Sequence, residues 1–258
     1  MAFDVELFQS ERCARGVTLG VELTASLETG STNDDAMEAA RAGAPHGSCF
    51  VTDSQRRGRG RRGARWLSPP GENLLCSVLL RPRLALEHAG TLTLAVGLAV
   101  REVIARRVSA DVRVKWPNDV VCNGRKLCGI LLESQLDGGR ISAIVVGIGL
   151  NVATRELPDE IAGRATTLAL LGARDLGREA LLVELLEALE ARVRVHEERG
   201  LEAAVDELRA HDALAGRRIR VDGVDGVGAG IASDGALLLR LDDGSIRPIR
   251  AGTVELDA

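Results

Sequence analysis

The sequence predicts an α+β fold, in which a mixed, mostly antiparallel sheet is flanked by helices and followed by a small all-β module. Strand-like and helix-like segments follow one another without a regular strand–helix–strand rhythm, which disfavours a parallel sheet. Two apolar runs, residues 126–132 and 141–150, are joined by Asp137-Gly138-Gly139, a hairpin signal. Beyond residue 213, Asp-Gly pairs recur at short spacing between apolar runs, which is typical of an all-β module.

The elements of the larger part follow from their periodicity and their end signals. Residues 1–16 are mixed in character, and we expect them to be irregular. Strands are predicted over 17–27, 48–52, 73–80, 112–116, 120–121, 126–132 and 141–150. Helices are predicted over 34–41, 92–107, 178–199 and 201–210.

The character of the chain changes near Ala215-Gly216. Four Asp-Gly pairs begin at positions 222, 225, 234 and 243 and separate about five short apolar runs. This pattern predicts a small barrel like an SH3 domain. We therefore expect two domains, a larger one over residues 1–212 and a small β domain over residues 213–258.

Composition excludes several classes of protein. The net charge of −4 disfavours a general nucleic-acid binder, in which a basic domain is expected. The longest uncharged run, residues 141–154, is too short to span a bilayer, and no signal peptide is visible. Five cysteines without a Cys-x-x-Cys pair predict free thiols, no zinc site and a cytoplasmic location.

Residues 56–65 form a loop of six arginines with glycine and alanine, directly after a predicted strand. Glycine lets the backbone approach a ligand closely, and arginine offers always-charged forks to phosphate or carboxylate. Because the charges repel one another, we expect the loop to be mobile when empty and ordered around an anion. A nucleic-acid or localisation patch is the alternative interpretation.

Only two of the 33 basic residues are lysines, Lys115 and Lys126, and they lie close together. Everywhere else the chain uses arginine for a positive charge. Lysine is a compact point charge on a slender stem, whereas arginine is a broad planar fork. We interpret at least one of the two lysines as functional, although chance would also account for them.

Three further segments carry polar groups at the ends of predicted elements. Ser31-Thr32-Asn33 precedes a helix, where it could simply cap the helix or face a small polar ligand. In Lys115-Trp116-Pro117-Asn118-Asp119 the proline stiffens the turn, and we expect the last two side chains to aim outward. Asp119 could hold Mg²⁺ against phosphates or order a loop, and an ordinary turn with Asx capping is the alternative. Gly147-Ile148-Gly149-Leu150-Asn151 lacks the third glycine of a dinucleotide fingerprint, and its glycines favour close approach of another group to the strand.

Taken together, the segments Gly58-Arg59-Gly60-Arg61-Arg62-Gly63 with Trp66, Lys115–Asp119, Lys126-Leu127-Cys128-Gly129 and Gly147–Asn151 resemble biotin–protein ligases in order and spacing. The resemblance covers about residues 29–151 in motifs and the remainder in layout. It implies a ligase core like that of class II synthetases and a reaction in two steps. Biotin and MgATP give biotinyl-5′-AMP, and biotin then passes to a lysine of a biotin carboxyl carrier protein domain.

The same resemblance assigns roles to residues. It implies that Lys126 and Arg61 are catalytic and that Asp119 is the Mg²⁺ ligand. It implies binding of biotin and its adenylate by Ser31, Thr32, Asn33, Gln55, Arg59, Gly60, Arg61 and Lys126. It implies binding of the nucleotide by Lys115, Trp116, Asn118, Asp119 and Asn151.

Two departures from the family pattern are visible. Ser31-Thr32-Asn33 lies too near the start to leave room for the DNA-binding arm of some members, so we expect no DNA partner and no membrane partner. A homodimer is compatible with the sequence. Residues 164–167 read Arg-Ala-Thr-Thr where some members offer a tryptophan to adenine. A lipoate–protein ligase and a nucleic-acid-binding regulator remain the alternative functions.

Overall fold

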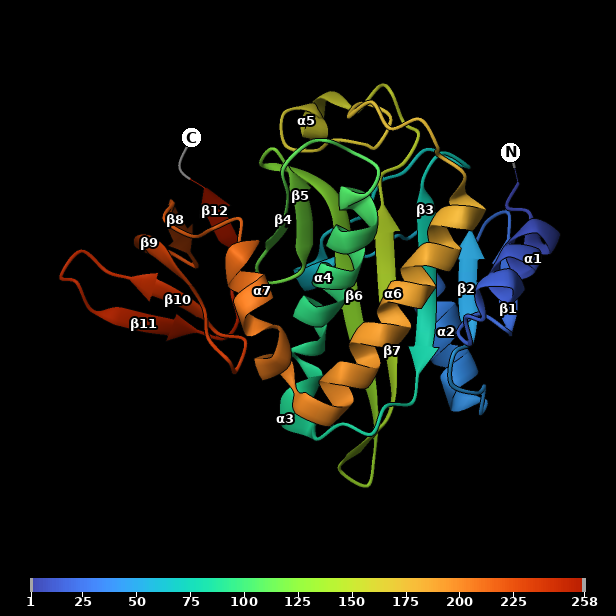
Figure 1. Cartoon of the computed structure of the whole chain (residues 1–258), viewed down its shortest axis with the longest axis horizontal. Coiled ribbons are helices and arrows are strands. Elements are labelled where there is room, and N and C mark those ends of the chain that lie inside the picture. The colour runs from blue at the N-terminus through green and yellow to red at the C-terminus, as the bar shows by residue number, and fades with distance from the viewer. Residues whose placement is uncertain (1, 257–258) are drawn as a thin grey trace.

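The computed structural model describes residues 2–256, which form two sheets with helices around the larger one (Figure 1). The seven-stranded sheet has the order β1-β2-β3-β7-β6-β5-β4, and every pairing is antiparallel except that of β1 with β2. Its strands are β1 Leu23–Ser26, β2 Cys49–Thr52, β3 Leu74–Leu80, β4 Val112–Lys115, β5 Asp119–Cys122, β6 Arg125–Asp137 and β7 Arg140–Leu150. The predicted α+β class with a mixed, mostly antiparallel sheet is confirmed.

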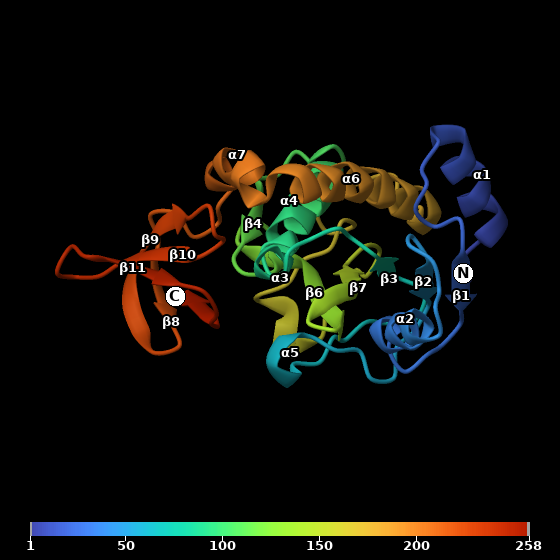
Figure 2. The same ribbon diagram turned by 90° about the horizontal axis from the view of Figure 1, so that it is seen from below.

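Helices cover both faces of this sheet (Figure 2). The longer helices α4 and α6 lie on one face, with α1 beside α6, whereas α2 packs on the opposite face against β2, β3 and β7. The α-helices are α1 Val5–Arg15, α2 Thr32–Arg41, α3 Leu86–Ala89, α4 Leu92–Ala105, α5 Asp159–Ala162, α6 Arg178–Arg199 and α7 Val205–Ala210. Two 3-10 turns occupy Arg61–Gly63 and Leu201–Ala204.

The main core lies between the sheet and the α4/α6 layer. Helix α4 is apolar around most of its circumference because it is packed between the sheet and α6. Leu98, Val100 and Leu182 have no exposed surface, and burying each such side chain stabilises the fold by roughly 1.5–3 kcal/mol. No helix within residues 2–256 is long and apolar enough to cross a membrane.

The predicted elements are found with one clear error at the N-terminus. Residues 5–15 form helix α1, where we expected irregular chain. The error arose because this helix has a weak apolar face, with Phe8 as its one buried residue. Its end signals were present, since Asp4 accepts a hydrogen bond from the Leu7 N–H and Gly16 adopts φ 67°.

Smaller differences concern element lengths. Strand β1 covers only four residues of the predicted 17–27, and the short helices α3 and α5 were not predicted. Strand β6 runs on to Asp137, because the hairpin turn is confined to Gly138 and Gly139 with φ 54° and 78°. All five cysteines are free thiols, as predicted, and only Cys13 is exposed.

The C-terminal module is a five-stranded antiparallel sheet with the order β11-β10-β9-β8-β12. Its strands are β8 Arg218–Val221, β9 Val224–Ile231, β10 Leu237–Arg240, β11 Ile246–Ile249 and β12 Val254–Leu256. The module shares a buried cluster with the larger part through Leu94, Leu98 and Trp116. The Trp116 indole N–H also donates to the Gly235 carbonyl at 3.0 Å, so the module is held at the side of the larger sheet next to β4.

Candidate active site

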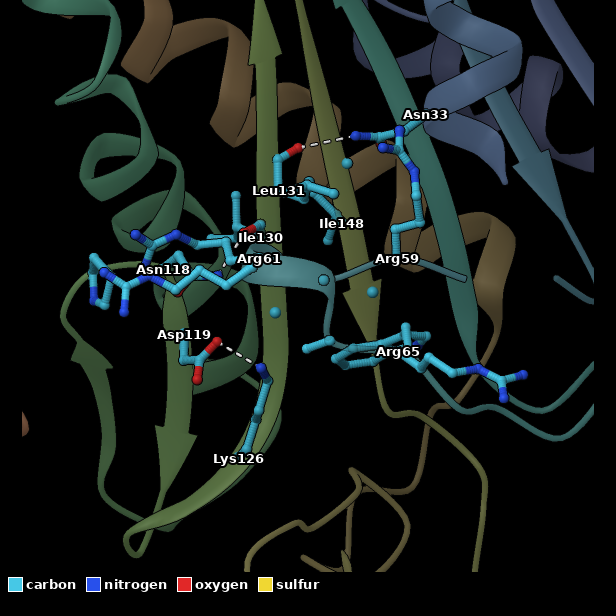
Figure 3. A pocket seen from close by; sticks show the side chains of 18 of the residues that line it. Asn33, Arg59, Arg61, Arg65, Asn118, Asp119, Lys126, Ile130, Leu131 and Ile148 are labelled. Carbon is cyan, nitrogen blue, oxygen red and sulfur yellow. Dashed lines mark hydrogen bonds and ion pairs between the residues drawn. The ribbon is translucent and has the colours of Figure 1, made fainter. Parts of the chain in front are cut away.

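A cavity of about 580 Å³ opens over the middle of the seven-stranded sheet. Strands β6 and β7 form its floor, the arginine loop and the start of α2 form its walls, and the segment before β12 closes one side. It is lined by every residue predicted for the site except one, namely Ser31, Thr32, Asn33, Gln55, Arg59, Gly60, Arg61, Lys115, Trp116, Asn118, Asp119 and Lys126. Segments separated by almost a hundred residues therefore meet in one place (Figure 3).

One end of the cavity presents hydroxyl and amide side chains from the start of α2. Asn33 donates to the Leu131 carbonyl at 3.3 Å, as Figure 3 shows, and to the Glu133 carboxylate at 2.7 Å. Its amide oxygen lies 2.7 Å from Ser77 Oγ, which is itself 2.8 Å from Thr32 Oγ1. An amide oxygen can only accept, so Ser77 donates to Asn33. This bond uses the single proton of the Ser77 hydroxyl, so in the second contact the Thr32 hydroxyl donates to Ser77. Ser77 belongs to this cluster, although in the sequence it is only a polar residue within an apolar run.

Ser31-Thr32-Asn33 does more than cap the helix. The Ser31 side chain makes no capping hydrogen bond, and Thr32 and Asn33 lie inside α2 rather than before it. Gln55 takes the capping role, since its amide oxygen accepts from the Thr32 N–H at 2.9 Å. The Ser31 side chain is therefore not committed to the helix end, and the residue lines the cavity.

The two glycines of β7 let two side chains lie directly on the sheet. A Cβ atom at Gly147 would overlap Asn33, and one at Gly149 would lie 2.6 Å from the Trp66 indole. Gly149 pairs with Gly129 on β6, where a Cβ atom would come within 2.9 Å of the same indole. This cross-strand glycine pair forms a flat platform for Trp66. The predicted close approach to this strand is thus made by the protein's own side chains.

The arginine loop folds back on itself in a tight turn. Gly60 N–H donates to the Ala64 carbonyl at 2.7 Å, and the Trp66 N–H donates to the Gly58 carbonyl at 3.0 Å. These bonds direct Arg61 towards the cavity, where its guanidinium donates to Asn118 at 3.4 Å. The Arg65 side chain extends in the opposite direction, away from Arg61 and Asp119, in Figure 3.

Our expectation of loop mobility rested on charge repulsion, and the structure modifies that premise. Arg59 lies 2.8 Å from an Asp34 oxygen and 2.6 Å from a Glu133 oxygen. Arg62 pairs with Asp222, and Arg56 with Glu28. Neighbouring carboxylates thus compensate much of the repulsion within the loop. Arg61, which points into the cavity, has a lowered pKa because burial and the adjacent Arg62 disfavour its charge.

Both lysines line the cavity, on either side of Asp119. The Lys126 ammonium lies 2.7 Å from Asp119 Oδ1, as Figure 3 shows, and 5.5 Å from the centre of the Trp66 ring. Lys115 is opposite Asp119 in the β4–β5 pairing and lies 3.4 Å from the Val254 carbonyl. The pKa of Lys115 is lowered, chiefly by burial, although Asp119 opposes this effect. A carboxylate between two ammonium groups leaves a net positive charge at this end.

The Trp-Pro-Asn-Asp turn faces inward, where the sequence suggested that Asn118 and Asp119 aim outward. Asn118 donates to the Ile130 carbonyl at 2.8 Å, which ties the turn to β6. Trp116 lines the cavity only in part, because its buried indole packs into the cluster shared with the C-terminal module. No group of three or more residues that could hold a metal ion occurs among residues 2–256.

Asn151 is the one predicted residue that the structure places outside the main cavity. Its side chain is buried and donates to the Thr166 carbonyl at 3.0 Å, which holds the segment after α5 against the sheet. It lines a separate cavity of about 270 Å³ together with apolar residues such as Leu67, Leu157 and Ile161. A contact between Asn151 and a nucleotide therefore remains a prediction.

The C-terminal module contributes to the main cavity through Gly252, Thr253 and Val254. We did not predict these residues, because the short runs between turn signals gave no hint of a ligand. Only the packing of the module against β4 and Trp116 brings them to the cavity.

Comparison with known proteins agrees with this geometry. Residues 29–151 match the Biotin/lipoate A/B protein ligase family, and residues 216–257 match the Biotin protein ligase C terminal domain. The biotin--[acetyl-CoA-carboxylase] ligase of Mycobacterium tuberculosis is 34% identical over 247 residues, covering 91% of this chain and 90% of the relative. The bifunctional ligase/repressor BirA of Bacillus subtilis is 32% identical over 232 residues, covering 88% of this chain and 71% of the relative.

A solved structure extends the similarity to three dimensions. The biotin protein ligase of Aquifex aeolicus, in complex with biotin and ATP, superposes with a TM-score of 0.80 and 30% identity, covering 92% of this chain and 99% of that one. The M. tuberculosis relative and the A. aeolicus structure both match this chain over nearly their full lengths. The chain therefore belongs to the biotin–protein ligase family.

Proposed function

We propose that this chain activates biotin with MgATP to biotinyl-5′-AMP and then transfers biotin to a lysine of a biotin carboxyl carrier protein domain. The observation that carries the proposal is the polarity gradient along one cavity. Hydroxyl and amide groups lie at the start of α2, where Asp34 and Glu133 compensate the charge of Arg59. Trp66 and Ile148 follow, and Lys115, Lys126 and Arg61 lie beyond them. Biotin has the same gradient, from its uncharged urea ring through an alkyl chain to its carboxylate.

The cationic end suits the first chemical step. A carboxylate oxygen of biotin attacks the α-phosphorus of ATP, and pyrophosphate leaves with the electron pair of the broken P–O bond. Both reactants are anionic, so Lys126 and Arg61 lower their repulsion and stabilise the additional charge of the transition state. In the second step, the unprotonated amine of the acceptor lysine attacks the acyl carbon, and AMP leaves. No side chain of this protein needs to act as a nucleophile.

The residues of the cavity fit a magnesium ion that is held mainly by substrate phosphates. Asp119 is the carboxylate of the cavity lining, and Mg²⁺ is commonly bound through one or two carboxylates together with phosphates. Asp119 would have to share its charge between the metal and Lys126, which lies 2.7 Å away. When bound, the metal would withdraw charge from the phosphate oxygens.

We propose that the larger domain covers residues 1–212 and the small one residues 213–258, with the five-stranded sheet curled as an SH3-like barrel. The end strands β11 and β12 are the two edges that a closed barrel would bring together. Because Trp116 and Leu98 join the two parts in one buried cluster, the larger part should lose stability without the smaller.

The acceptor is proposed to be the carrier domain of a biotin-dependent carboxylase, in the cytoplasm, and a homodimer is compatible with the chain. A DNA-binding role would have to use the arginine loop. Three of its arginines, Arg56, Arg59 and Arg62, already pair with carboxylates of this chain, which reduces the charge available for phosphate contacts.

Radiolabelled pyrophosphate exchange into ATP tests the first step. Exchange should require biotin and should not occur with lipoate. Exchange that lipoate supports and biotin does not would reassign the chain to lipoate ligation. Absence of exchange with both acids, together with DNA affinity that falls steeply with salt, would favour the regulator.

A further inference from the structure

The arginine loop is tied to the C-terminal sheet by a single polar cluster. Arg62 donates to both oxygens of Asp222, at 2.8 and 3.0 Å, and to Thr253 Oγ1 at 3.0 Å. Asp222 also accepts from the Thr253 N–H at 2.9 Å. We call these three residues the loop latch. The latch joins the arginine loop to two segments of the C-terminal sheet, the turn after β8 and the segment before β12. These two segments lie side by side because β8 pairs with β12.

The backbone of the latch is strained at both ends. Arg62 has φ 53° and Asp222 has φ 45°, and these are two of the three non-glycine residues with positive φ within residues 2–256. Such a conformation disfavours an ordinary side chain and persists only where surrounding contacts impose it. At Arg62 these contacts are the turn closed by Gly60 and Ala64, and the ion pair to the other domain.

The strained residue is directly next to Arg61. Because Arg62 turns outward to the C-terminal sheet, the preceding side chain turns inward to the cavity, where it reaches Asn118. Thr253 takes part in both places, since it belongs to the latch and also lines the cavity. The latch thus couples the position of the C-terminal sheet to the placement of a cavity arginine.

We propose that Asp222 and Thr253 act as positioning residues, which hold the arginine loop closed through Arg62 and so keep Arg61 against the reacting groups. The role in catalysis rests on the proposed ligase function, whereas the closure of the loop does not. Opening of the latch frees Arg61 and lets the adenylate leave. The C-terminal domain thereby controls whether the activated intermediate is retained until an acceptor arrives.

Electrostatics supports a permanently charged latch. Hydrogen bonds from Arg62 and from the Thr253 backbone lower the pKa of Asp222 to about 2, and the same pair raises the pKa of Arg62. Both groups therefore keep their charge throughout the neutral range. Both side chains are about half exposed, so the pair is easily reached by salt and contributes modestly.

Limited trypsin digestion of the ligand-free protein tests closure without reference to any ligase activity. The loop carries its own cleavage sites at its arginines, and Asp222→Asn leaves all of them in place. Asparagine also tolerates the positive φ and can still accept from Thr253. We expect cleavage within residues 56–65 to be about two- to fivefold faster in this variant, as for the loss of one exposed ion pair.

Asp225→Asn is the matched control. Asp225 makes a similar two-oxygen pair with Arg220 on the same sheet, at a similar exposure, and that pair does not involve the loop. The control should leave loop cleavage unchanged. Arg62→Lys keeps a trypsin site at this position but cannot donate to both oxygens of Asp222 as the planar guanidinium does, so it should not add to Asp222→Asn when the two are combined. Unchanged cleavage in Asp222→Asn, or full additivity, would overturn the latch.

The catalytic consequence is measured as the amount of free biotinyl-AMP released per biotin transferred to the carrier domain. A change in stability alone would reduce both quantities together, whereas an open latch raises their ratio, by about two- to fivefold in Asp222→Asn. An unchanged ratio would remove the positioning role. If the wild-type protein forms no biotinyl-AMP, the proposed function fails, and the digestion experiment still decides whether the latch exists.

Discussion

The ammonium group of Lys126 lies 2.7 Å from the carboxylate of Asp119, at the cationic end of the cavity. The same ammonium stands 5.5 Å from the centre of the Trp66 ring, which rests on the glycine platform of β6 and β7. Asp119 therefore compensates the charge of Lys126, and Trp66 confines its alkyl chain. Such an arrangement holds a compact point charge, and a planar guanidinium does not fit the same space without moving Trp66 or Asp119.

Lys126→Arg should fold but lose biotin adenylation by about 100-fold or more, the usual cost of removing a positioned donor to a developing oxyanion. The measurement is biotin-dependent pyrophosphate exchange, with circular dichroism to verify folding. Arg125→Lys, at the exposed neighbouring position, is the control and should stay close to wild type. Exchange within about threefold of wild type in Lys126→Arg would remove Lys126 from the mechanism.

Gly149→Ala should displace the Trp66 indole, because the new Cβ would lie 2.6 Å from the ring. Overpacking of this kind costs typically about 1–3 kcal/mol of unfolding free energy. Urea titration should detect this loss, and calorimetry should show weaker biotin binding. Gly163→Ala is the control, since a Cβ atom there meets nothing within 4 Å and φ is negative. Equal stability of the two variants would contradict the platform.

Arg61→Gly should release biotinyl-AMP and label bystander proteins while labelling itself very little. Escaped adenylate acylates unprotonated amines, and arginine stays protonated. This chain has only Lys115 and Lys126 as lysines, and both line the cavity. Its lowered pKa makes Lys115 the more reactive candidate should any self-labelling occur.

The readout is mass spectrometry after incubation with biotin, MgATP and a lysine-rich bystander protein. Arg56→Gly, at an exposed position of the same loop, should label the bystander no more than wild type does. The idea fails if Arg61→Gly labels no bystander. It also fails if side chains other than the two lysines are strongly labelled.

Stability should fall as the pH drops below about 6.5, the ordinary value of histidine. Burial lowers the pKa of His196, whose ring lies 3.2 Å from Thr91 Oγ1 and 3.1 Å from the His88 carbonyl. The unfolded chain then binds a proton that the folded chain refuses, so the loss continues down to the folded pKa. His196→Gln should flatten this decline in denaturant midpoints between about pH 7 and 5. An unchanged slope would show that His196 is not its source.

Local sequence patterns determined most elements of this protein, because each depends on neighbours in the chain. Helix α6 begins at Arg178 and ends at Arg199 as predicted, since periodicity and end signals are local. The Asp137-Gly138-Gly139 hairpin follows from the same kind of information. Helix α1 shows the limit of periodicity, because a helix with one buried side chain carries almost no apolar pattern.

Residue chemistry also indicated the candidate site, because the bias against lysine singled out Lys115 and Lys126. The patterns could not show which of these residues lie close together in space. Asn33 and Trp66 occupy the space that Gly147 and Gly149 leave free. This arrangement depends on contacts between segments that are far apart in the chain. The inward turn of Asp119 and the exclusion of Asn151 from the cavity likewise depend on packing.

The latch between Arg62 and Asp222 is the clearest case of a feature that only the tertiary structure decided. The two residues are 160 positions apart. Arg62 is in a segment that reads as a basic loop, and Asp222 is in one that reads as an Asp-Gly turn, so neither segment points to the other. Their meeting depends on how the C-terminal sheet packs beside Trp116, and hence on the buried cluster that this sheet shares with the larger part of the chain. Local propensity contains no information about that area, because burial is a property of the assembled surfaces.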